Sequence, residues 1–328
     1  MKTLWNRLLA TSLRPRCLYG ASVLRVMAGC VILYQYLINY AQRGYLFGPD
    51  GVFSFADFAA QQQAVGSFSL YHLTPSAIWF EVLYHVGIAV AMAWVLGWRT
   101  RLLSPINYLL WISLHNRFPQ LWDGGDNLMQ IVLIYALFAE VGAHFSFDAS
   151  RRAARGQSSE PTGAWAIAHN AALLAIALQV CLVYGVAGLT KVRGEVWQNG
   201  TALYYALRSP DYRLPGVSSL LYENGVLLTL LAYATVAFQV AFPFLVFAHR
   251  HTRTAAVLIG ISFHLAIGSV MGLVTFALFL IAADLALIGD AEYRALGALA
   301  RRARARAERW LPGRRGATPA PDPDAALS

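Results

Sequence analysis

Long apolar runs, each close to the length that crosses a bilayer, restrict what this chain can fold into more than any other feature. They fall at about residues 17–39, 76–97, 102–116, 127–143, 165–189, 225–248 and 255–289. The hydrocarbon core of a membrane is about 30 Å thick and requires roughly 20 apolar residues per helix. With 57% hydrophobic and only 13% charged residues, the chain lies outside the range of soluble domains. The runs therefore predict an all-α, polytopic helical bundle in a membrane.

The first run also invites comparison with a secretory signal peptide, because it follows a basic N-terminal segment. However, residues 17–39 are longer than the apolar core of a signal peptide, and they include Arg25 and Asn39. No convincing small-residue cleavage site follows a short apolar core, as a signal peptide requires. We therefore expect this run to be retained as the first span.

The last run, residues 255–289, is long for one span and short for two. Charge separates the alternatives, because cytoplasmic segments are enriched in Lys and Arg. If two spans meet near Met271 and Gly272, 19 of the 26 Lys and Arg residues face the cytoplasm and six face outside. We therefore expect about eight transmembrane helices in a cell membrane, with both termini cytoplasmic. The short third and fourth runs leave a partly re-entrant arrangement open.

The formal net charge of +9 does not require a nucleic-acid partner, because the excess lies in the predicted cytoplasmic loops and in the tail. Residues 1–289 are expected to form one transmembrane domain. Residues 290–311 predict a basic amphipathic helix on the cytoplasmic side, which either lies on anionic lipid or is solvated and serves only as a topology signal. We expect disorder over residues 312–328.

The spacing of cysteines and histidines predicts no metal site. Cys17, Cys30 and Cys181 form no spaced pair, and no two histidines have ligand spacing on one helix. We therefore expect neither a disulfide framework nor a bound metal.

Polar residues gather near the outer face of the predicted bundle. Depths estimated at about 1.5 Å per residue place there His115, Asn116, Arg117, Asp123, Asp126, Asn127, Lys191 and Trp197, with Glu81, His85 and His264 reaching inward. Ionisable groups inside a membrane are usually functional. These residues therefore predict a polar-lined cavity that faces outside.

Several of these residues have structural alternatives. Asp126 follows two glycines and is placed to cap the fourth span. Glu81 and His85 lie four residues apart on one helical face and are expected to bond to each other. His264 lies in a helix rich in small residues, where an interhelical hydrogen bond is the commoner role.

Two further ionisable residues, Arg25 and Asp284, lie at similar predicted depths near the cytoplasmic face. They either pair with each other, or Arg25 snorkels to the membrane surface and Asp284 lies at the interface. A pair at that depth would be structural rather than catalytic.

Lys191 follows an apolar stretch, "VAGL", so its amine is expected to be partly desolvated. A desolvated amine loses its preference for the charged form, and an amine near neutrality is a competent general base. The alternative is a lysine that reaches the outer headgroups. The next segment, "GEVWQNGTALYYAL", contains Trp197 and suits either an aromatic belt or a short helix that lies over the cavity as a lid.

Four stretches together resemble a known family. "RGYLFGPDGVFSF", "SLHNRFPQLWDGGDNLMQIVLIYALF", "GLTKVRGEVWQNGTALYYAL" and "FHLAIGSVMGLVTFALFLIAADL" are similar, in order and spacing, to the HTTM domain. This is the membrane domain of vitamin K-dependent gamma-carboxylase, found also in many bacterial proteins and in the SdpB family of toxin-maturation proteins. The resemblance covers roughly residues 15–290.

The resemblance implies an activity. In the carboxylase a lysine is taken to deprotonate vitamin K hydroquinone, and oxygenation then produces a base strong enough for a glutamate γ proton to be removed before CO2 adds. Lys191 matches that lysine, which implies a general base and a reduced naphthoquinone of the vitamin K or menaquinol type as cofactor, with O2 and CO2. The polar loop matches as well. The resemblance therefore implies that a quinol oxygen or an anionic substrate is bound by residues of this loop, with the candidates His115, Asn116, Arg117, Asp123 and Asp126. Trp197 and His264 complete the expected binding residues.

The chain also departs from the carboxylase. Thr190 precedes Lys191 where the carboxylase has two adjacent lysines, and no large lumenal portion is present, so a propeptide-bearing protein substrate is not expected. The expected partners are the bilayer, a lipid quinone and, in an SdpB-like alternative, a secreted peptide or a maturation partner. In that alternative the chain is an accessory factor without quinol chemistry, and a plain transporter is a third interpretation.

Overall fold

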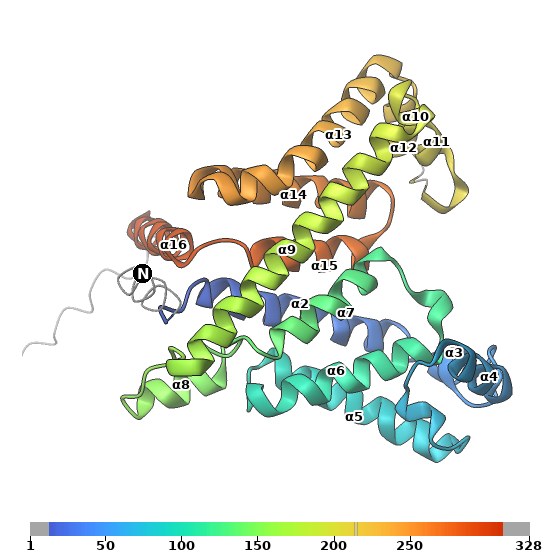
Figure 1. Ribbon diagram of the computed structural model, residues 1–328, viewed down its shortest axis with the longest axis vertical. Coiled ribbons are helices and arrows are strands. Elements are labelled where there is room, and N and C mark those ends of the chain that lie inside the picture. Colours follow the sequence, from blue (N-terminus) through green and yellow to red (C-terminus); the bar gives the residue numbers. More distant parts are fainter. Residues whose placement is uncertain (1–12, 213, 215, 311–328) are drawn as a thin grey trace, which may run out of the picture. The chain divides into compact units, whose positions relative to one another are not determined.

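The computed structural model describes residues 13–310 except residues 213 and 215, and those residues form helices without any strand (Figure 1). The longer helices are α2 (Leu18–Ile38), α5 (Ala77–Val95), α6 (Thr100–Arg117), α7 (Gly124–Ala136), α9 (Gly163–Arg193), α13 (Gly225–Ala248), α14 (Arg250–Val270), α15 (Val274–Leu285) and α16 (Asp290–Trp310). The shorter ones are α3 (Arg43–Phe47), α4 (Phe55–Val65), α8 (Phe147–Ala154), α10 (Glu195–Gln198), α11 (Ala202–Arg208) and α12 (Val217–Tyr222), with single 3₁₀ turns η1 (Leu70–His72), η2 (Pro119–Leu121) and η3 (Pro210–Tyr212). The predicted all-α class is confirmed.

Five helices of the described chain are long and apolar enough to cross a membrane: α2, α5, α9, α13 and α14. A sixth span results if α15 and the start of α16 count as one broken span. The protein is therefore a multi-pass membrane protein, but the predicted count of eight is not confirmed. Length excludes α7 and α15, whose 13 and 12 residues reach only about 20 Å and 18 Å at 1.5 Å per residue. Composition excludes α6, because its 18 residues include polar side chains such as Arg101, Asn107 and Asn116.

Polar side chains begin several of these helices. Ser76, Ser146 and Asn224 each accept a hydrogen bond from the backbone N–H three residues later, at the starts of α5, α8 and α13. Such caps satisfy backbone donors that have no partner within the helix. They explain why the helices start at these positions.

The long run at residues 255–289 forms two helices, as the charge distribution predicted. The chain reverses between α14 and α15 at Met271–Leu273, where Gly272 adopts a positive φ of 74°. A residue with a Cβ is disfavoured in that region. The reversal lets α15 pack against α14, α2 and α7, and Figure 1 shows α15 lying between α14 and α2. Its Phe279, Ala282 and Asp284 are fully buried.

Arg25 of α2 is also fully buried, but it does not pair with Asp284. Its guanidinium instead donates to the carbonyl oxygens of Trp94 and Val95, where α5 ends, and to those of Val141 and Phe145, in the segment between α7 and α8. Neither alternative left open by the sequence holds, because Arg25 and Asp284 do not pair and both are fully buried, with Asp284 bonded to Tyr184. Arg25 ties three segments of the bundle together through their backbone.

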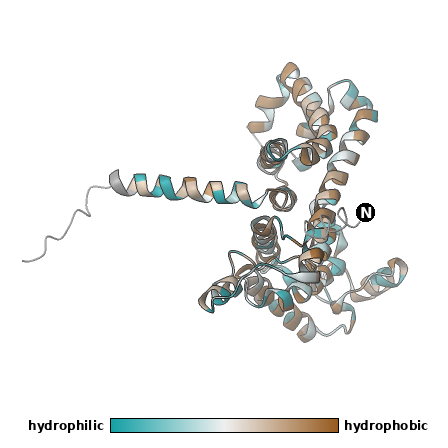
Figure 2. Ribbon diagram, turned by 60° about the vertical axis from the view of Figure 1, so that its left-hand side comes forward, coloured by the Kyte–Doolittle hydropathy of each residue, from teal (hydrophilic) through white to brown (hydrophobic). Residues whose placement is uncertain are grey.

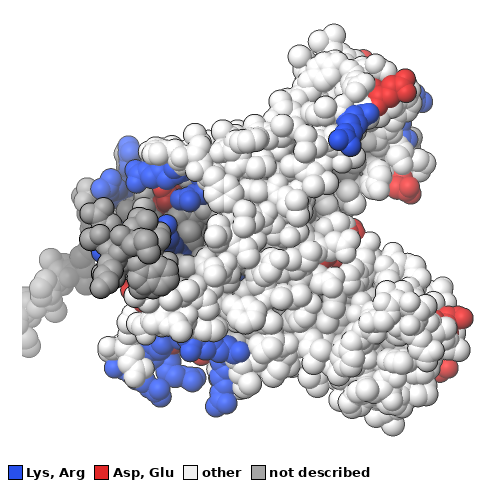
Figure 3. Space-filling model, viewed as in Figure 1, with Lys and Arg blue, Asp and Glu red and all other residues white. Residues whose placement is uncertain are grey.

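Charged residues are unevenly distributed over the surface. Figure 3 shows Lys and Arg gathered over the end of the molecule that carries α8, where Arg99, Arg101 and Arg151 are exposed. Hydrophobic residues dominate the long helices (Figure 2). This pattern agrees with a cytoplasmic position of the α8 end, which stays a prediction.

The C-terminal helix α16 forms a unit of its own from Ala291 onward. Hydrophilic and hydrophobic residues alternate along it (Figure 2), and Leu296 and Leu299 are exposed. The predicted helix over residues 290–311 therefore corresponds to α16, while its membrane contact stays a prediction. The segment 312–328, predicted to be disordered, lies outside the described residues.

Candidate functional site

A largely apolar cavity of about 270 Å³ lies among α9, α13, α14 and α15 and is covered by α10 and α11. Its lining residues are Val183, Tyr184, Ala187, Lys191, Trp197, Leu203, Ala206, Thr235, Gln239, Phe263, His264, Ile267, Met271, Phe276 and Leu280. Three predicted site residues, Lys191, Trp197 and His264, therefore come together in one cavity. The volume is slightly below the range of about 300–1,000 Å³ that is typical of small-molecule sites.

Lys191 lies in the last turn of α9, which continues to Arg193, beyond the predicted end of this span. Its Nζ is 3.4 Å from the carbonyl oxygen of Ala187 and 5.1 Å from the centroid of the Trp197 ring. No carboxylate within the described residues forms an ion pair with it. The amine is therefore held by an aromatic face and a carbonyl and is not neutralised by an acid.

The segment after Lys191 forms the two short helices α10 and α11, which contribute Trp197, Leu203 and Ala206 to the cavity. Between them the chain turns at Gly200, whose φ is 71°. A Cβ at this position would lie 2.6 Å from Cγ2 of Thr229 on α13. Gly200 is thus needed both for the turn and for the close approach that holds these helices against α13.

A buried polar network lies on one wall of the cavity. The Tyr184 hydroxyl on α9 donates to Oδ2 of Asp284 on α15 over 2.8 Å, and it is 2.8 Å from Nε2 of His264 on α14. The Tyr184 ring stacks on Phe242 with 3.8 Å between centroids, which fixes the position of the hydroxyl. The interhelical hydrogen bond predicted for His264 is confirmed.

The sequence reasoning did not identify Tyr184 and Asp284 as members of a site. A signal was available for Tyr184, because it precedes Lys191 by seven residues and two helical turns bring both residues to one face of α9. For Asp284 the sequence predicts only a pair with Arg25 or a place at the interface, since depth along a helix does not reveal which neighbour a side chain faces.

Three polar atoms in and beside the cavity have no hydrogen-bond partner within the described residues. They are Oε1 of Gln239, Nδ1 of His264 and Oδ1 of Asp284, all of them buried. A buried polar atom without a partner costs about 1–3 kcal/mol, and native proteins contain few of them. The cavity wall is therefore ready to bind a polar group that the protein itself does not supply.

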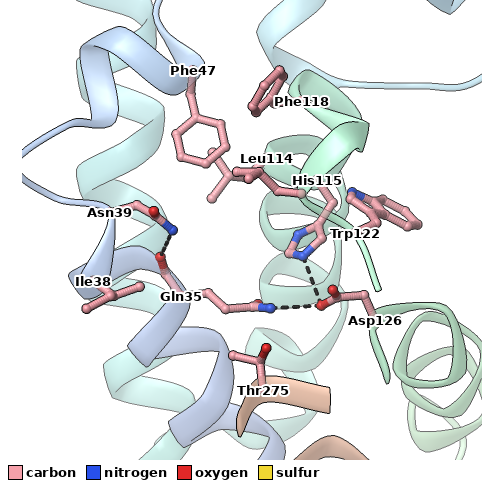
Figure 4. A pocket seen from close by; sticks show the side chains of 11 residues that line it. Gln35, Ile38, Asn39, Phe47, Leu114, His115, Phe118, Trp122, Asp126 and Thr275 are labelled. Atoms are coloured by element: carbon pink, nitrogen blue, oxygen red, sulfur yellow. Dashed lines mark hydrogen bonds and ion pairs between the residues drawn. The ribbon is translucent and has the colours of Figure 1, made fainter. Parts of the chain in front are cut away.

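Other predicted site residues line a second, smaller pocket of about 150 Å³ (Figure 4). There Oδ1 of Asp126 accepts a hydrogen bond from Nε2 of Gln35 over 2.8 Å and lies 3.2 Å from Nε2 of His115. The Gln35 side chain in turn accepts from Trp111. These bonds connect α2, α6 and α7, so the main role of His115 and Asp126 is to hold these helices together.

The start of α7 differs in detail from its prediction. Asp123 is the N-cap, since its Oδ1 accepts from the backbone N–H groups of Gly125 and Asp126, while Oδ2 of Asp126 accepts from the N–H of Asp123. Asp126 therefore takes part in the cap as predicted, but the N-cap position itself is Asp123, three residues earlier. Both residues form a reciprocal capping box, which uses Oδ1 of Asp123 and Oδ2 of Asp126, while Oδ1 of Asp126 bonds to Gln35 and His115 on other helices. Burial, reinforced by the nearby Asp126 carboxylate, raises the pKa of Asp123.

Asn116 and Arg117 point away from both cavities and hold the loop between α2 and α5. Arg117 is buried and donates to the carbonyl oxygens of Gly48 and Phe53, and Asn116 donates to that of Phe68. The guanidinium also lies 4.8 Å from the centroid of the Phe58 ring. These contacts give both side chains a structural role in the folding of the loop.

The single polar-lined cavity predicted from depth is therefore two separate sites. The first turn of α15 lies between them, because Thr275 lines the pocket of His115 and Asp126 while the adjacent Phe276 lines the cavity of Lys191. The predicted Glu81–His85 contact is confirmed on the outside of α5, where Arg43 joins it. No cluster of three metal-ligating side chains occurs in the part of the chain that the structure describes.

The fold and cavity define the class of this molecule as a multi-pass helical membrane protein with an unneutralised lysine at an apolar cavity. The chain belongs to the HTTM domain family, whose model matches residues 21–289. It is also similar to the sporulation-delaying protein SdpB of Bacillus subtilis (strain 168), with 23% identity over 213 residues. That match covers 62% of each chain, so this chain spans less than two thirds of the relative's length. No solved structure matches.

Proposed function

We propose that this protein is a membrane enzyme of the gamma-carboxylase-like class, in which Lys191 takes a proton from a lipid-soluble quinol. The observation that carries the proposal is the position of the Lys191 amine at an apolar cavity, where no carboxylate of the described residues forms an ion pair with it. An acid beside it would hold the amine in its charged form. Apolar surroundings, in contrast, disfavour the charged form of an amine, and a neutral amine can accept a proton from a substrate.

The cavity residues fit a reduced naphthoquinone. Apolar and aromatic side chains dominate the walls, as a fused ring requires, and buried acceptor atoms on Gln239 and His264 have no partner within the described residues. When bound, the quinol would supply the oxygen-dependent chemistry implied by the family. Within the protein, Lys191 would accept the hydroxyl proton, Trp197 would hold the ammonium that results, and the apolar walls would exclude water.

The composition of the walls also favours a quinol over a peptide. Each residue of a peptide brings a backbone N–H and a C=O that need partners when buried. The polar side chains of the cavity are only Tyr184, Lys191, Thr235, Gln239 and His264, with the indole of Trp197. A ring with two hydroxyl groups makes smaller demands on such a wall.

The test uses purified protein in nanodiscs with reduced menaquinone, bicarbonate and O2, and measures quinone epoxide by chromatography. The Lys191→Met variant should lose the rate by about 100-fold or more while binding of menadione stays within a few-fold of wild type. Arg193→Met is the matched control, because it removes an exposed cation from the same helix end. Equal epoxide rates in wild type and Lys191→Met would contradict the assignment of the base.

A second function is favoured by the similarity to a sporulation-delaying protein. In this alternative the protein is an accessory factor for the maturation or export of a secreted peptide and does no quinol chemistry. Deletion of the gene would then leave a small exported peptide in its precursor form, and the Lys191→Met variant would restore the mature peptide. Absence of epoxide together with this rescue would replace the enzyme proposal by the accessory one.

A further inference from the structure

The buried network of Asp284, Tyr184 and His264 is more than a structural bond between helices. Tyr184 is 2.8 Å from both partners, whereas Nε2 of His264 and Oδ2 of Asp284 are 4.0 Å apart. The hydroxyl therefore bridges two groups that are too far apart for a direct hydrogen bond. Only His264 and Tyr184 line the cavity, while Asp284 is fully buried behind them.

A small residue makes this arrangement possible. Gly260 on α14 faces the centre of the network, and a Cβ there would lie 2.7 Å from Oδ2 of Asp284 and 2.8 Å from the hydroxyl oxygen of Tyr184. No real Cβ atom approaches so closely. The three polar groups thus meet where α14 carries no side chain, in a space that an alanine would fill.

The directions of the hydrogen bonds follow from the donors available. With the Asp284 carboxylate ionised, Tyr184 donates its single proton to Oδ2, so its oxygen accepts from Nε2–H of His264. Neutral His264 then carries its proton on Nε2, and Nδ1 has a free lone pair. That Nδ1 is buried and has no partner within the described residues, so it is a free acceptor on a residue that lines the cavity.

We propose that Asp284, Tyr184 and His264 form a proton relay that accepts the hydroxyl proton of an aromatic ligand in the cavity. The ligand O–H bond breaks and its proton joins Nδ1 of His264, while the electron pair stays on the ligand oxygen. The Nε2 proton passes to Tyr184 and the Tyr184 proton passes to Oδ2 of Asp284. His264 ends as the other neutral tautomer, and Asp284 ends as a neutral carboxylic acid.

This relay rests on the proposed function and extends it, because it gives the cavity a second proton acceptor besides Lys191. A ligand with two hydroxyl groups on one ring system engages both acceptors. The substrate class is therefore a dihydroxy aromatic compound and not a simple phenol or a fatty acid. His264 contacts the ligand directly, whereas Tyr184 and Asp284 act through His264 and are positioning residues.

The experiment uses full-length protein in nanodiscs and three probes. 1-Naphthol carries the hydroxyl, 1-methoxynaphthalene replaces it by an ether, and 4-nitro-1-naphthol absorbs visible light when its hydroxyl loses the proton. Wild type should bind 1-naphthol about tenfold more tightly than the ether, as one hydrogen bond allows. It should also generate the coloured anion of the nitro probe at a pH where the free probe stays protonated.

Asp284→Asn and Tyr184→Phe separate a relay from a merely structural bond. Asp284→Asn keeps an acceptor for Tyr184 but cannot take up the proton, so it should retain the preference for 1-naphthol and lose the coloured anion. Tyr184→Phe should reduce the preference to about twofold or less and also lose the anion. Binding of the ether at wild-type affinity shows that each variant keeps its cavity.

Formation of the anion at wild-type level in both variants would overturn the relay. The Lys191→Met variant keeps this test independent of the proposed function, because the relay predicts that its preference for 1-naphthol stays at wild-type level. If epoxide formation fails while the anion depends on Asp284, the relay stands and the carboxylase-like function does not. If the anion does not depend on Asp284 while epoxide forms, the reverse holds.

Discussion

At the scale of single residues, buried cations carry much of the connection between segments of this bundle. Arg25 and Arg117 are the two buried arginines of the described chain, and both bind backbone carbonyl oxygens and not carboxylates. The planar guanidinium presents five donors in a fixed fork. It therefore satisfies carbonyl groups of the segments that connect helices, such as those of Val141 and Phe145 beside Arg25 and that of Phe53 beside Arg117.

Replacement of Arg25 by Leu should lower the free energy of unfolding by about 2–4 kcal/mol, because it leaves several buried carbonyl oxygens without donors. The readout is the midpoint of thermal unfolding in detergent, with Arg151→Leu, an exposed site near the same end, as control. If Arg25 instead paired with Asp284, an added Asp284→Asn change would recover stability. We expect the two effects to be additive.

Asp123 offers a pH-dependent test. Burial and Asp126 raise its pKa in the folded state, so the unfolded chain releases this proton first, and folding loses stability as pH rises from the unfolded pKa to the folded one. Asp123→Asn keeps an acceptor for the N-cap but has no proton to release. The variant should therefore show a flatter unfolding midpoint between about pH 4 and 7, equal to or above wild type at neutral pH.

The control for this prediction is Asp123→Ala, which removes the cap and should be about 1 kcal/mol less stable than Asp123→Asn at every pH. A variant Asp123→Asn whose midpoint follows the same pH dependence as wild type would show that another group is responsible.

At the scale of elements, close helix contacts depend on which glycine faces the neighbour. Gly188 and Gly185 lie on α9, which packs against α13. A Cβ on Gly188 would lie 2.9 Å from the backbone nitrogen of Val240, whereas a Cβ on Gly185 meets only Pro243 at an ordinary 3.6 Å. Membrane helices approach closely where such small residues meet.

Gly188→Ala should therefore force α9 and α13 apart and cost about 1–3 kcal/mol. Gly185→Ala should be neutral or slightly stabilising, because alanine is the better helix former. Gln239 and Tyr184 line the cavity next to this crossing, so Gly188→Ala should also weaken binding of menadione. Equal unfolding midpoints for both variants, measured in the same detergent, would show that the crossing tolerates a methyl group.

Elements were largely predictable from the sequence, because apolar runs and polar caps are local signals. The helices at residues 76–97, 225–248 and the two within 255–289 lie close to their predicted positions. Contacts between elements were not predictable in this way. The depths of Lys191 and His115 along their helices predicted one cavity for both residues. However, depth gives no information on how a helix is rotated about its axis. In the structure the first turn of α15 lies between the two residues.

At the scale of the whole molecule, the distribution of charge predicts the orientation in the membrane. The loop that contains Gln157 lies among exposed arginines of the α8 end, and cytoplasmic loops are enriched in cations. This loop should therefore face the cytoplasm, and the segment that contains Glu223 should face outside. Single cysteines at these exposed positions test the assignment after the native cysteines are replaced. A membrane-impermeant maleimide should label Glu223→Cys but not Gln157→Cys in intact cells, and the reverse pattern would invert the topology.

The sequence by itself determined the class, the family and the position of most helices, because hydrophobic length and the order of short matching stretches are properties of the chain alone. It also indicated Lys191, Trp197 and His264, which the fold brings together in one cavity. Only the tertiary structure decided which polar groups meet. Asp284 lies against Tyr184 and Gly260 because α15 folds back along α14, and Asn116 and Arg117 bind a loop because its carbonyl groups need donors. Such pairings depend on helix rotation and long-range packing, which no local pattern records.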